Sequence, residues 1–401
     1  MDFWHTIGEA SLTSAGFFWK AGWAFILGYA VSGMIQAFVP KDRLTPYLGG
    51  DGFKSVSLAS FFGAASSSCS FAALAAARSL VLKGAHFVAA IAFMFASTNL
   101  VIELGILILI FLGWQFLAAE IIGALLLILI STVLIRLTYP KKWLEAAREK
   151  VKREAETEEG EFDWRKRIRS REGWYLVGHR FVSDWKMVWE EILIGFTVAG
   201  FVAVVVPTSF WEAIFLIKYV GVLPEYLIVA ENAVVAPFVA AATFIGSMGN
   251  IPLATVLSSN GVLFGGIMGF IYSDLMVPPL VMINAKYYGW RVALYIAGVM
   301  FASIVLTAFA MHYIFELFAI TPGSVESISG TDRFALDYTF YFNIIFLAVA
   351  AILVWLHRRH LKTVAKGGAG MGSAITVKTV IALVFASVVV VGLVAGILNK
   401  Q

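Results

Sequence analysis

The chain has 401 residues, of which 60% are hydrophobic and 14% charged, and its formal net charge is +4. Its long apolar runs exclude a soluble globular protein, and they do not alternate as the strands of a β-barrel do. The single cysteine excludes an internal disulfide and a CxxC motif, and the sequence has no P-loop, dinucleotide-binding turn or HExxH motif. We therefore expect an all-α polytopic protein of the cytoplasmic membrane, surrounded by lipid, that is not an enzyme and binds no cofactor or nucleic acid.

Eight apolar runs are long enough to predict full membrane-spanning helices. Two further runs, at about 53–82 and 228–259, are interrupted by polar clusters in their middles. The full spans are expected at about 17–39, 86–112, 115–137, 189–207, 262–284, 291–313, 334–356 and 377–398.

Two polar-interrupted segments look like distant copies of each other. They cover residues 66–103 and 246–280, and a shift of 177 positions aligns six identical residues, among them Gly84 with Gly261. Each copy is an apolar run, a small polar cluster, a short apolar run, a glycine and a long apolar run. Duplicated segments of this kind are the best sequence pointer to the substrate site of a transporter.

The distribution of basic residues predicts which loops face the cytoplasm. Residues 138–187 contain thirteen Lys or Arg, and residues 357–362 form a second basic segment, so both are expected inside the cell. Both can lie inside only if the run at 228–259 enters and leaves the membrane on one face. We therefore predict re-entrant hairpins of two half-helices at 53–82 and 228–259, in two repeats of inverted orientation. The alternative is ten plain spans with two helices kinked at Gly and Ser.

The predicted hairpins would bring two polar tips, at Ser66–Ser70 and Gly246–Asn250, together near the middle of the membrane. The duplication and the charge pattern also divide the chain into four parts. These are a first transmembrane repeat at 1–137, a basic cytoplasmic loop with an interfacial helix at 138–188, a second inverted repeat at 189–313, and two additional transmembrane helices at 314–401.

The first tip carries Ser67, Ser68, Cys69 and Ser70, which we expect to line the substrate site. A thiolate binds soft ions such as trivalent arsenic, so Cys69 is a candidate ligand for a soft metalloid. The alternative is that Cys69 is a small packing residue, because free cysteine is often buried.

Each copy also contains a polar group inside its long span. In the first, Asn99 and Glu103 are four residues apart and are expected to share a helix face. The carboxylate is a candidate for proton or ion coupling, or for pairing with Arg78, unless it lies in water near the helix end. In the second, Ser273 and Asp274 precede a Pro-Pro pair that breaks the helix. Freed carbonyl groups beside Asp274 favour a proton or cation site; the alternative is that Asp274 caps the next half-helix.

The second tip is expected to begin a half-helix at Asn250, just ahead of Pro252. The N-termini of both half-helices would direct positive dipole ends at the membrane centre, which suits an anion. Asn99, Asn250 and Ser273 complete the predicted substrate ligands, whereas Glu120 and Glu191 are interpreted as interfacial.

Several short motifs resemble the predicted permease family that includes the organoarsenical efflux permease ArsP. They are the serine-rich tip Ser67-Ser68-Cys69-Ser70, then Lys83-Gly84-Ala85, Asp184-Trp185-Lys186-Met187 and Asn250-Ile251-Pro252-Leu253-Ala254. The resemblance covers most of residues 17–313 and implies a secondary permease for small solutes, in the best-studied members trivalent organoarsenicals moved outward. The first cysteine of the family's Cys-Ser-Cys tip falls on Ser67, so only Cys69 of a dithiol-like site is present.

These patterns predict a secondary permease that moves a small solute through a midplane site between the two tips. The solute would be a trivalent organoarsenical or a related soft metalloid, with Glu103 and Asp274 coupling its export to protons or another ion. The alternative is a channel or transporter for a small inorganic or sulfur-containing anion bound at the half-helix N-termini. The sequence leaves the solute, the direction of transport and the oligomeric state open.

Overall fold

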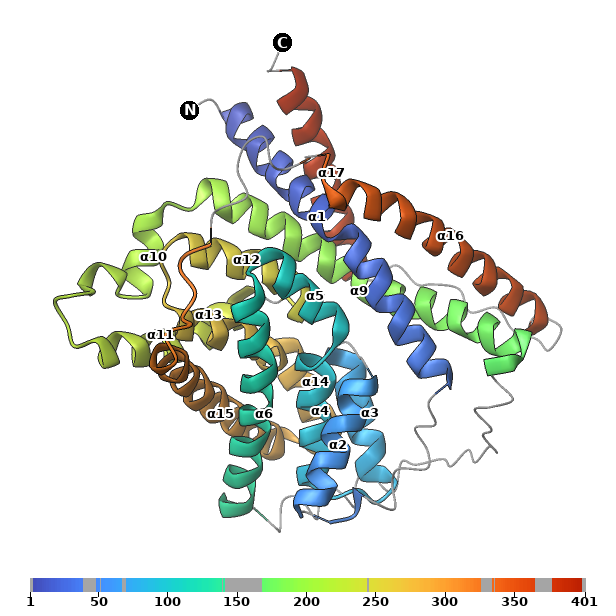
Figure 1. Cartoon of the computed structure of the whole chain (residues 1–401), viewed down its shortest axis with the longest axis horizontal. Coiled ribbons are helices and arrows are strands. Elements are labelled where there is room, and N and C mark those ends of the chain that lie inside the picture. Colours follow the sequence, from blue (N-terminus) through green and yellow to red (C-terminus); the bar gives the residue numbers. More distant parts are fainter. Residues whose placement is uncertain are drawn as a thin grey trace.

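The protein is described by a computed structural model, in which the described residues are helical, with short turns and no strand (Figure 1). Seven of the described helices are long and apolar enough to cross a membrane, or eight if one bent pair is a single span. The predicted all-helical membrane class is therefore confirmed. The described residues are 3–38, 48–50, 52–66, 70–138, 140, 168–243, 245–325, 334, 336–364 and 377–398.

The helices follow one another with short connections. In chain order they are α1 (Phe3–Phe38), α2 (Phe53–Ser66), α3 (Ser70–Leu82), α4 (Phe87–Asn99), α5 (Ile102–Phe111), α6 (Trp114–Thr138), α9 (Arg171–Val205), α10 (Thr208–Ile214), the 3-10 helix η2 (Ile217–Tyr219), α11 (Glu225–Thr243), α12 (Ser247–Ser259), α13 (Phe264–Ile271), the 3-10 helix η3 (Tyr272–Met276), α14 (Pro278–Tyr288), α15 (Trp290–Leu317), α16 (Tyr338–Val364) and α17 (Val377–Leu398).

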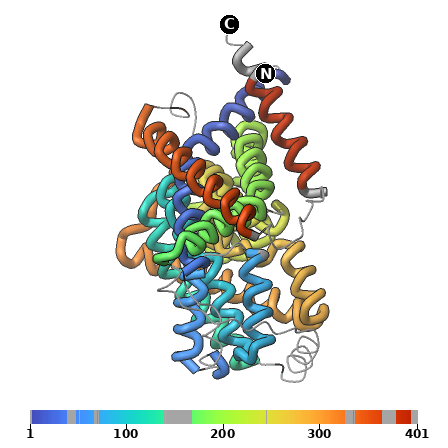
Figure 2. The backbone as a smooth tube through the Cα atoms, turned by 90° about the vertical axis from the view of Figure 1, so that its right-hand side faces the viewer, coloured from blue at the N-terminus to red at the C-terminus, as the bar shows by residue number. Residues whose placement is uncertain are grey.

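Four long helices, α1, α9, α16 and α17, pack against one another along one side of the molecule (Figure 1). α1 and α9 cross closely because Gly200 leaves room for Ser14, whose hydroxyl donates to the Ala10 carbonyl (2.9 Å) and the Thr197 carbonyl (3.3 Å). Small residues allow such close crossings inside a bilayer, where hydrophobicity does not drive helix association. α1 begins and α17 ends at the same end of the molecule (Figure 2).

The remaining helices form a second body beside this group. α2 and α3 both pack on α4, α11 packs on α13, and α6 packs on α15. The 3-10 helix η3 contacts α11, α12, α13, α14 and α15, so it lies inside this body. The exposed stripe of α6 is apolar and recurs every four residues, at Ile121, Leu125 and Leu129, as expected for a face against lipid.

Two basic segments of the chain meet at one end of the molecule. The ring of His179, near the start of α9, stacks on His357 (5.3 Å between centroids) and lies 4.6 Å from His360 at the end of α16. α9 runs without a break from Arg171 to Val205, so the segment predicted as an interfacial helix forms the first part of a longer helix. The acidic and basic stretch at 141–167 lies outside the described residues.

Candidate functional site

Each half of the chain contains a helix that breaks in the interior of the molecule. In the second half, α13 passes into η3, and Val277 is extended (φ −60°, ψ 140°) before α14 begins. The predicted Pro-Pro pair explains this break, since proline lacks an N–H and excludes the α conformation from the residue before it.

The break in the first half was not predicted. α4 ends at Asn99, α5 begins at Ile102, and the two axes differ by 43°. The expectation that Asn99 and Glu103 share one helix face is therefore wrong, because they belong to separate, differently directed helices. No proline or glycine marks this position, so the surrounding packing rather than local sequence determines the break.

Asp274 is the centre of the buried polar group. It lies in η3, its side chain is fully buried, and its Oδ2 accepts a hydrogen bond from the Ser70 hydroxyl (2.9 Å). The other oxygen of this carboxylate, Oδ1, has no hydrogen-bond partner among the described residues. Because Ser70 is the first residue of α3, the carboxylate also faces the positive end of that helix.

Glu120 is buried within electrostatic range of Asp274, which corrects its interpretation as an interfacial residue. It is 1% exposed, and neither carboxylate oxygen has a hydrogen-bond partner among the described residues. Glu120 interacts electrostatically with Asp274 and with Tyr272. The Tyr272 hydroxyl donates to the carbonyl of the adjacent Ala119 (2.7 Å), so η3 rests on the turn of α6 that carries Glu120.

Glu103 is buried in the first turn of α5, where it packs against Gly28 of α1. The N-terminal end of a helix stabilises a carboxylate there. Asn99 is also buried; its amide nitrogen donates to the Phe95 carbonyl (3.1 Å), while its Oδ1 has no partner in the described part of the chain. The Ser273 hydroxyl donates to the Gly269 carbonyl of the preceding helix, α13.

The second predicted tip joins α11 to α12. The helix begins at Ser247, with Gly246 as its N-cap, so the expectation that Asn250 opens the half-helix is wrong by one turn. The Asn250 amide instead fixes the connection: its Oδ1 accepts from the Thr243 hydroxyl (3.2 Å), and its Nδ2 donates to the Ile245 carbonyl (3.3 Å).

Glu191 of α9 also belongs to this second tip. Its carboxylate lies against Gly246, and it interacts electrostatically with Asp274. α9 can approach α12 closely because both helices have glycine at the contact; a Cβ on Gly195 would lie 2.6 Å from the Gly249 Cα. The sequence did not indicate this contact of Glu191 with the second tip.

The first predicted tip lies partly outside the described residues. This applies to Ser67, Ser68 and Cys69, so the role of the thiol stays a prediction. The flanking Ser66 and Ser70 are buried, and Ser66 donates to the Gly63 carbonyl (2.9 Å).

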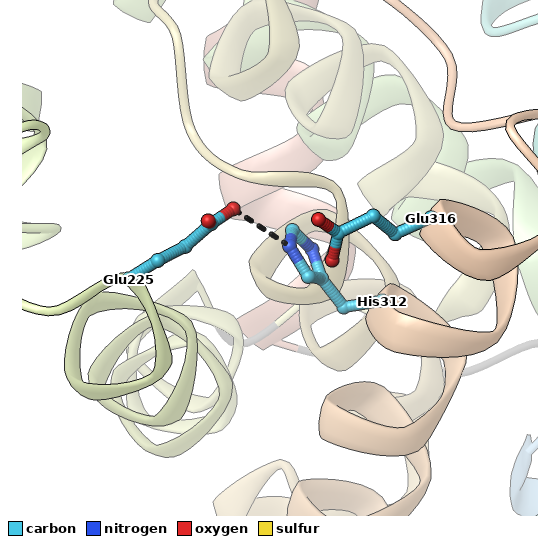
Figure 3. Close-up of side chains that lie close together, drawn as sticks. All are labelled: Glu225, His312 and Glu316. Atoms are coloured by element: carbon cyan, nitrogen blue, oxygen red, sulfur yellow. Dashed lines mark ion pairs between the residues drawn. The ribbon is translucent and has the colours of Figure 1, made fainter.

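A separate cluster of Glu225, His312 and Glu316 lies where α11 begins and α15 ends (Figure 3). The ligand atoms are within 4.8 Å of one another and line a cavity of about 350 Å³. The Gly265 N–H donates to His312 Nδ1 (3.3 Å), which assigns the ring hydrogen to Nε2, 3.9 Å from Glu225 Oε1. The ring therefore offers the carboxylates a donor rather than offering a metal ion a lone pair.

The sequence contained a usable signal for Glu120 but little for Tyr272. A carboxylate inside the apolar run of α6 is a functional candidate by default. Tyr272 has no such signal, because an aromatic residue in an apolar run is ordinary; only its contact with Ala119 and Gly123 connects it with the site.

Comparisons with a family model and with a known protein both identify similarity to permeases. A sequence model of the ArsP_1 family, described as "Predicted permease", matches residues 6–313. The Mycobacterium tuberculosis protein Rv2963, named as a candidate permease, is 38% identical over 329 residues, which cover 79% of each chain. No solved structure matches the chain. The family match includes Ser70, Glu120 and Asp274.

Proposed function

The chain belongs to the ArsP_1 family of predicted permeases, and from this premise we propose a secondary permease of the cell membrane with its solute site between two helical hairpins. The observation that carries the proposal is the hydrogen bond from Ser70 to Asp274. It joins the start of a half-helix in the first repeat to a broken helix in the second. Broken helices around a buried site are typical of secondary transporters.

Contacts at the ends of both helix pairs support the hairpin arrangement. The His86 N–H donates to the Leu48 carbonyl (2.8 Å), so the chain before α2 lies beside the chain after α3. Glu225, at the start of α11, and Gly261, just after α12, line the same cavity. Both contacts support a return of each pair to the side from which it started.

The packing pattern supports two equivalent repeats, with α1 to α6 corresponding to α9 and α11 to α15. α2 packs on α4 as α11 packs on α13, and α4 packs on α6 as α13 packs on α15. α1 packs on its counterpart α9, and α6 packs on its counterpart α15, as an approximate twofold axis between the repeats requires. The meeting of the two basic segments at His179 and His357 supports a common cytoplasmic side for both.

The charges around Asp274 favour a neutral or cationic solute over an anion. Asp274 interacts electrostatically with Glu120 and Glu191. Glu191 lies against Gly246, so the N-terminus of α12 already faces a carboxylate and is less available to a second negative charge. This weighs against the anion alternative.

A soft metalloid remains the solute that the chain's chemistry favours. Cys69 stands one residue before Ser70, whose hydroxyl reaches Asp274. One thiol among the hydroxyls of Ser67 and Ser68 would bind a trivalent organoarsenical weakly and reversibly, as transport requires. We propose that Asp274 couples this export to protons, with Glu103 as a second candidate for the same role.

Flux measurements in proteoliposomes test the solute class. The purified protein should export a methylated trivalent arsenical with saturation, and Cys69→Ser should lower this flux at least tenfold because the soft ligand is lost. Ser387→Ala, an exposed change on α17, is the control and should keep the wild-type flux.

Two results would contradict the proposal. Full arsenical flux in Cys69→Ser would remove the thiol from the mechanism. Flux of a sulfur oxyanion in place of the arsenical, rising without saturation, would favour the anion channel.

A further inference from the structure

We propose that Glu120 and Asp274 form a coupled carboxyl pair that shares the transported proton. The inference rests on the proposed function and names its coupling ion and a second residue that holds it. The two groups come from different repeats: Glu120 from α6 and Asp274 from η3.

The contact between α6 and η3 fixes the geometry of the pair. Tyr272 Oη donates to the Ala119 carbonyl (2.7 Å), immediately before Glu120 in the chain. At Gly123, three residues after Glu120, the Tyr272 hydroxyl fills the space that a Cβ would need. Residues three apart lie on one helix face, so Glu120 faces the 3-10 helix that carries Asp274.

The surroundings of the pair require a proton. Both oxygens of Glu120 and the Oδ1 of Asp274 are buried with no hydrogen-bond partner among the described residues. A buried carboxylate without a partner is strongly unfavourable, and two carboxylates that interact in an apolar site do not readily both ionise. Among the described residues, the other titratable groups in electrostatic contact with the pair are Tyr272 and Glu191, and neither is a cation. At least one proton therefore stays on the pair until a conformational change admits water.

A route to the pair leads from the cavity beside His312. Phe116, one turn before Glu120 on the same face of α6, lines this cavity, which also contains the Glu225 and Glu316 carboxylates. The Phe116 ring packs edge-on against Phe264 (5.2 Å between centroids). Opening of this aromatic contact would admit a proton toward Glu120 from the end where α11 begins.

Infrared difference spectroscopy of the purified protein between alkaline and acidic buffer tests the pair. The wild type should show the carbonyl band of a buried, protonated carboxyl group. Glu120→Gln and Asp274→Asn should each remove or shift most of this band, and the double variant should lack it altogether. Glu172→Gln, an exposed change at the start of α9, should leave it intact.

Several outcomes separate this inference from the proposed function. An unchanged band in Glu120→Gln, or a wild-type band that depends on Na⁺ rather than on pH, overturns the pair even if the protein transports solute. The predicted band without any arsenical flux overturns the proposed solute and leaves the pair standing. Glu120→Asp, which keeps a carboxyl group and should retain a shifted band, replaces Glu120→Gln if that variant does not fold.

Discussion

At the residue scale, the hydrogen bond from Ser70 affects whether the Asp274 carboxyl group is ionised or protonated. A hydroxyl that donates to a carboxylate stabilises the ionised form, whereas the unpartnered Oδ1 leaves room for a proton or a solute. The site therefore has one satisfied and one open carboxylate oxygen, which suits a group that changes its proton during a cycle.

This arrangement predicts unequal effects for two substitutions. Asp274→Asn should abolish arsenical accumulation driven by a pH gradient, because the amide cannot exchange a proton. Ser70→Ala should slow it roughly tenfold, since a hydrogen bond to a charged group contributes about 1.5–3 kcal/mol.

The measurement is the rate of arsenical uptake into proteoliposomes with an imposed pH gradient. The double variant with Ser70→Ala and Asp274→Asn should take up arsenical no more slowly than Asp274→Asn alone. Gradient-driven uptake in Asp274→Asn at the wild-type rate would contradict the coupling role. Glu172→Gln serves again as the control for removal of one carboxylate.

Clear physical reasons explain why the sequence indicated Asp274 as a candidate and Glu120 as interfacial. A carboxylate followed by a Pro-Pro pair in an apolar run must lie beside freed backbone carbonyls. Glu120 stands about 9 Å along α6 from Trp114 at 1.5 Å per residue, a depth compatible with either an interface or the interior. Only the contact of α6 with η3 decides between them.

At the element scale, the fit of η3 against α6 depends on the absence of a side chain at Gly123. Gly123→Ala should lower the melting temperature of the purified protein, because its Cβ would collide with the Tyr272 hydroxyl and overpacking costs about 1–3 kcal/mol. Tyr272→Phe should restore part of the loss in the double variant by removing the colliding oxygen.

Gly298→Ala is the matched control, because nothing lies within 4 Å of a Cβ at that position in α15. It should be neutral or slightly stabilising, as alanine is the better helix former. Equal melting temperatures for Gly123→Ala and Gly298→Ala would refute the close contact between α6 and η3.

Hydropathy was sufficient to predict most elements but not their breaks. α6 begins and ends within one residue of its predicted span, because lipid requires a continuous apolar run. The break between Asn99 and Ile102 has no breaker residue. It follows from the packing of α5 on α1, where Gly28 admits Glu103, and no local pattern encodes that contact.

At the scale of the whole molecule, the account depends on two helix pairs that enter the membrane from opposite faces. Contacts at Leu48 and His86 join the ends of the first pair, and the cavity at Glu225 and Gly261 joins the ends of the second. The charge pattern predicted this arrangement. Both basic segments can face the cytoplasm only if the second pair returns to its own side, and the same arrangement of the first pair places Lys54 and Lys83 inside as well.

Labelling of single cysteines in oriented vesicles, in a Cys69→Ser background, tests this central claim most directly. Gly52→Cys and Lys83→Cys, at the ends of the first pair, should react from the cytoplasmic face, together with the reference Glu172→Cys. Glu225→Cys and Ser259→Cys, at the ends of the second pair, should react only from the other face. Reaction of Gly52→Cys and Lys83→Cys from different faces, or of all four positions from one face, would contradict the account.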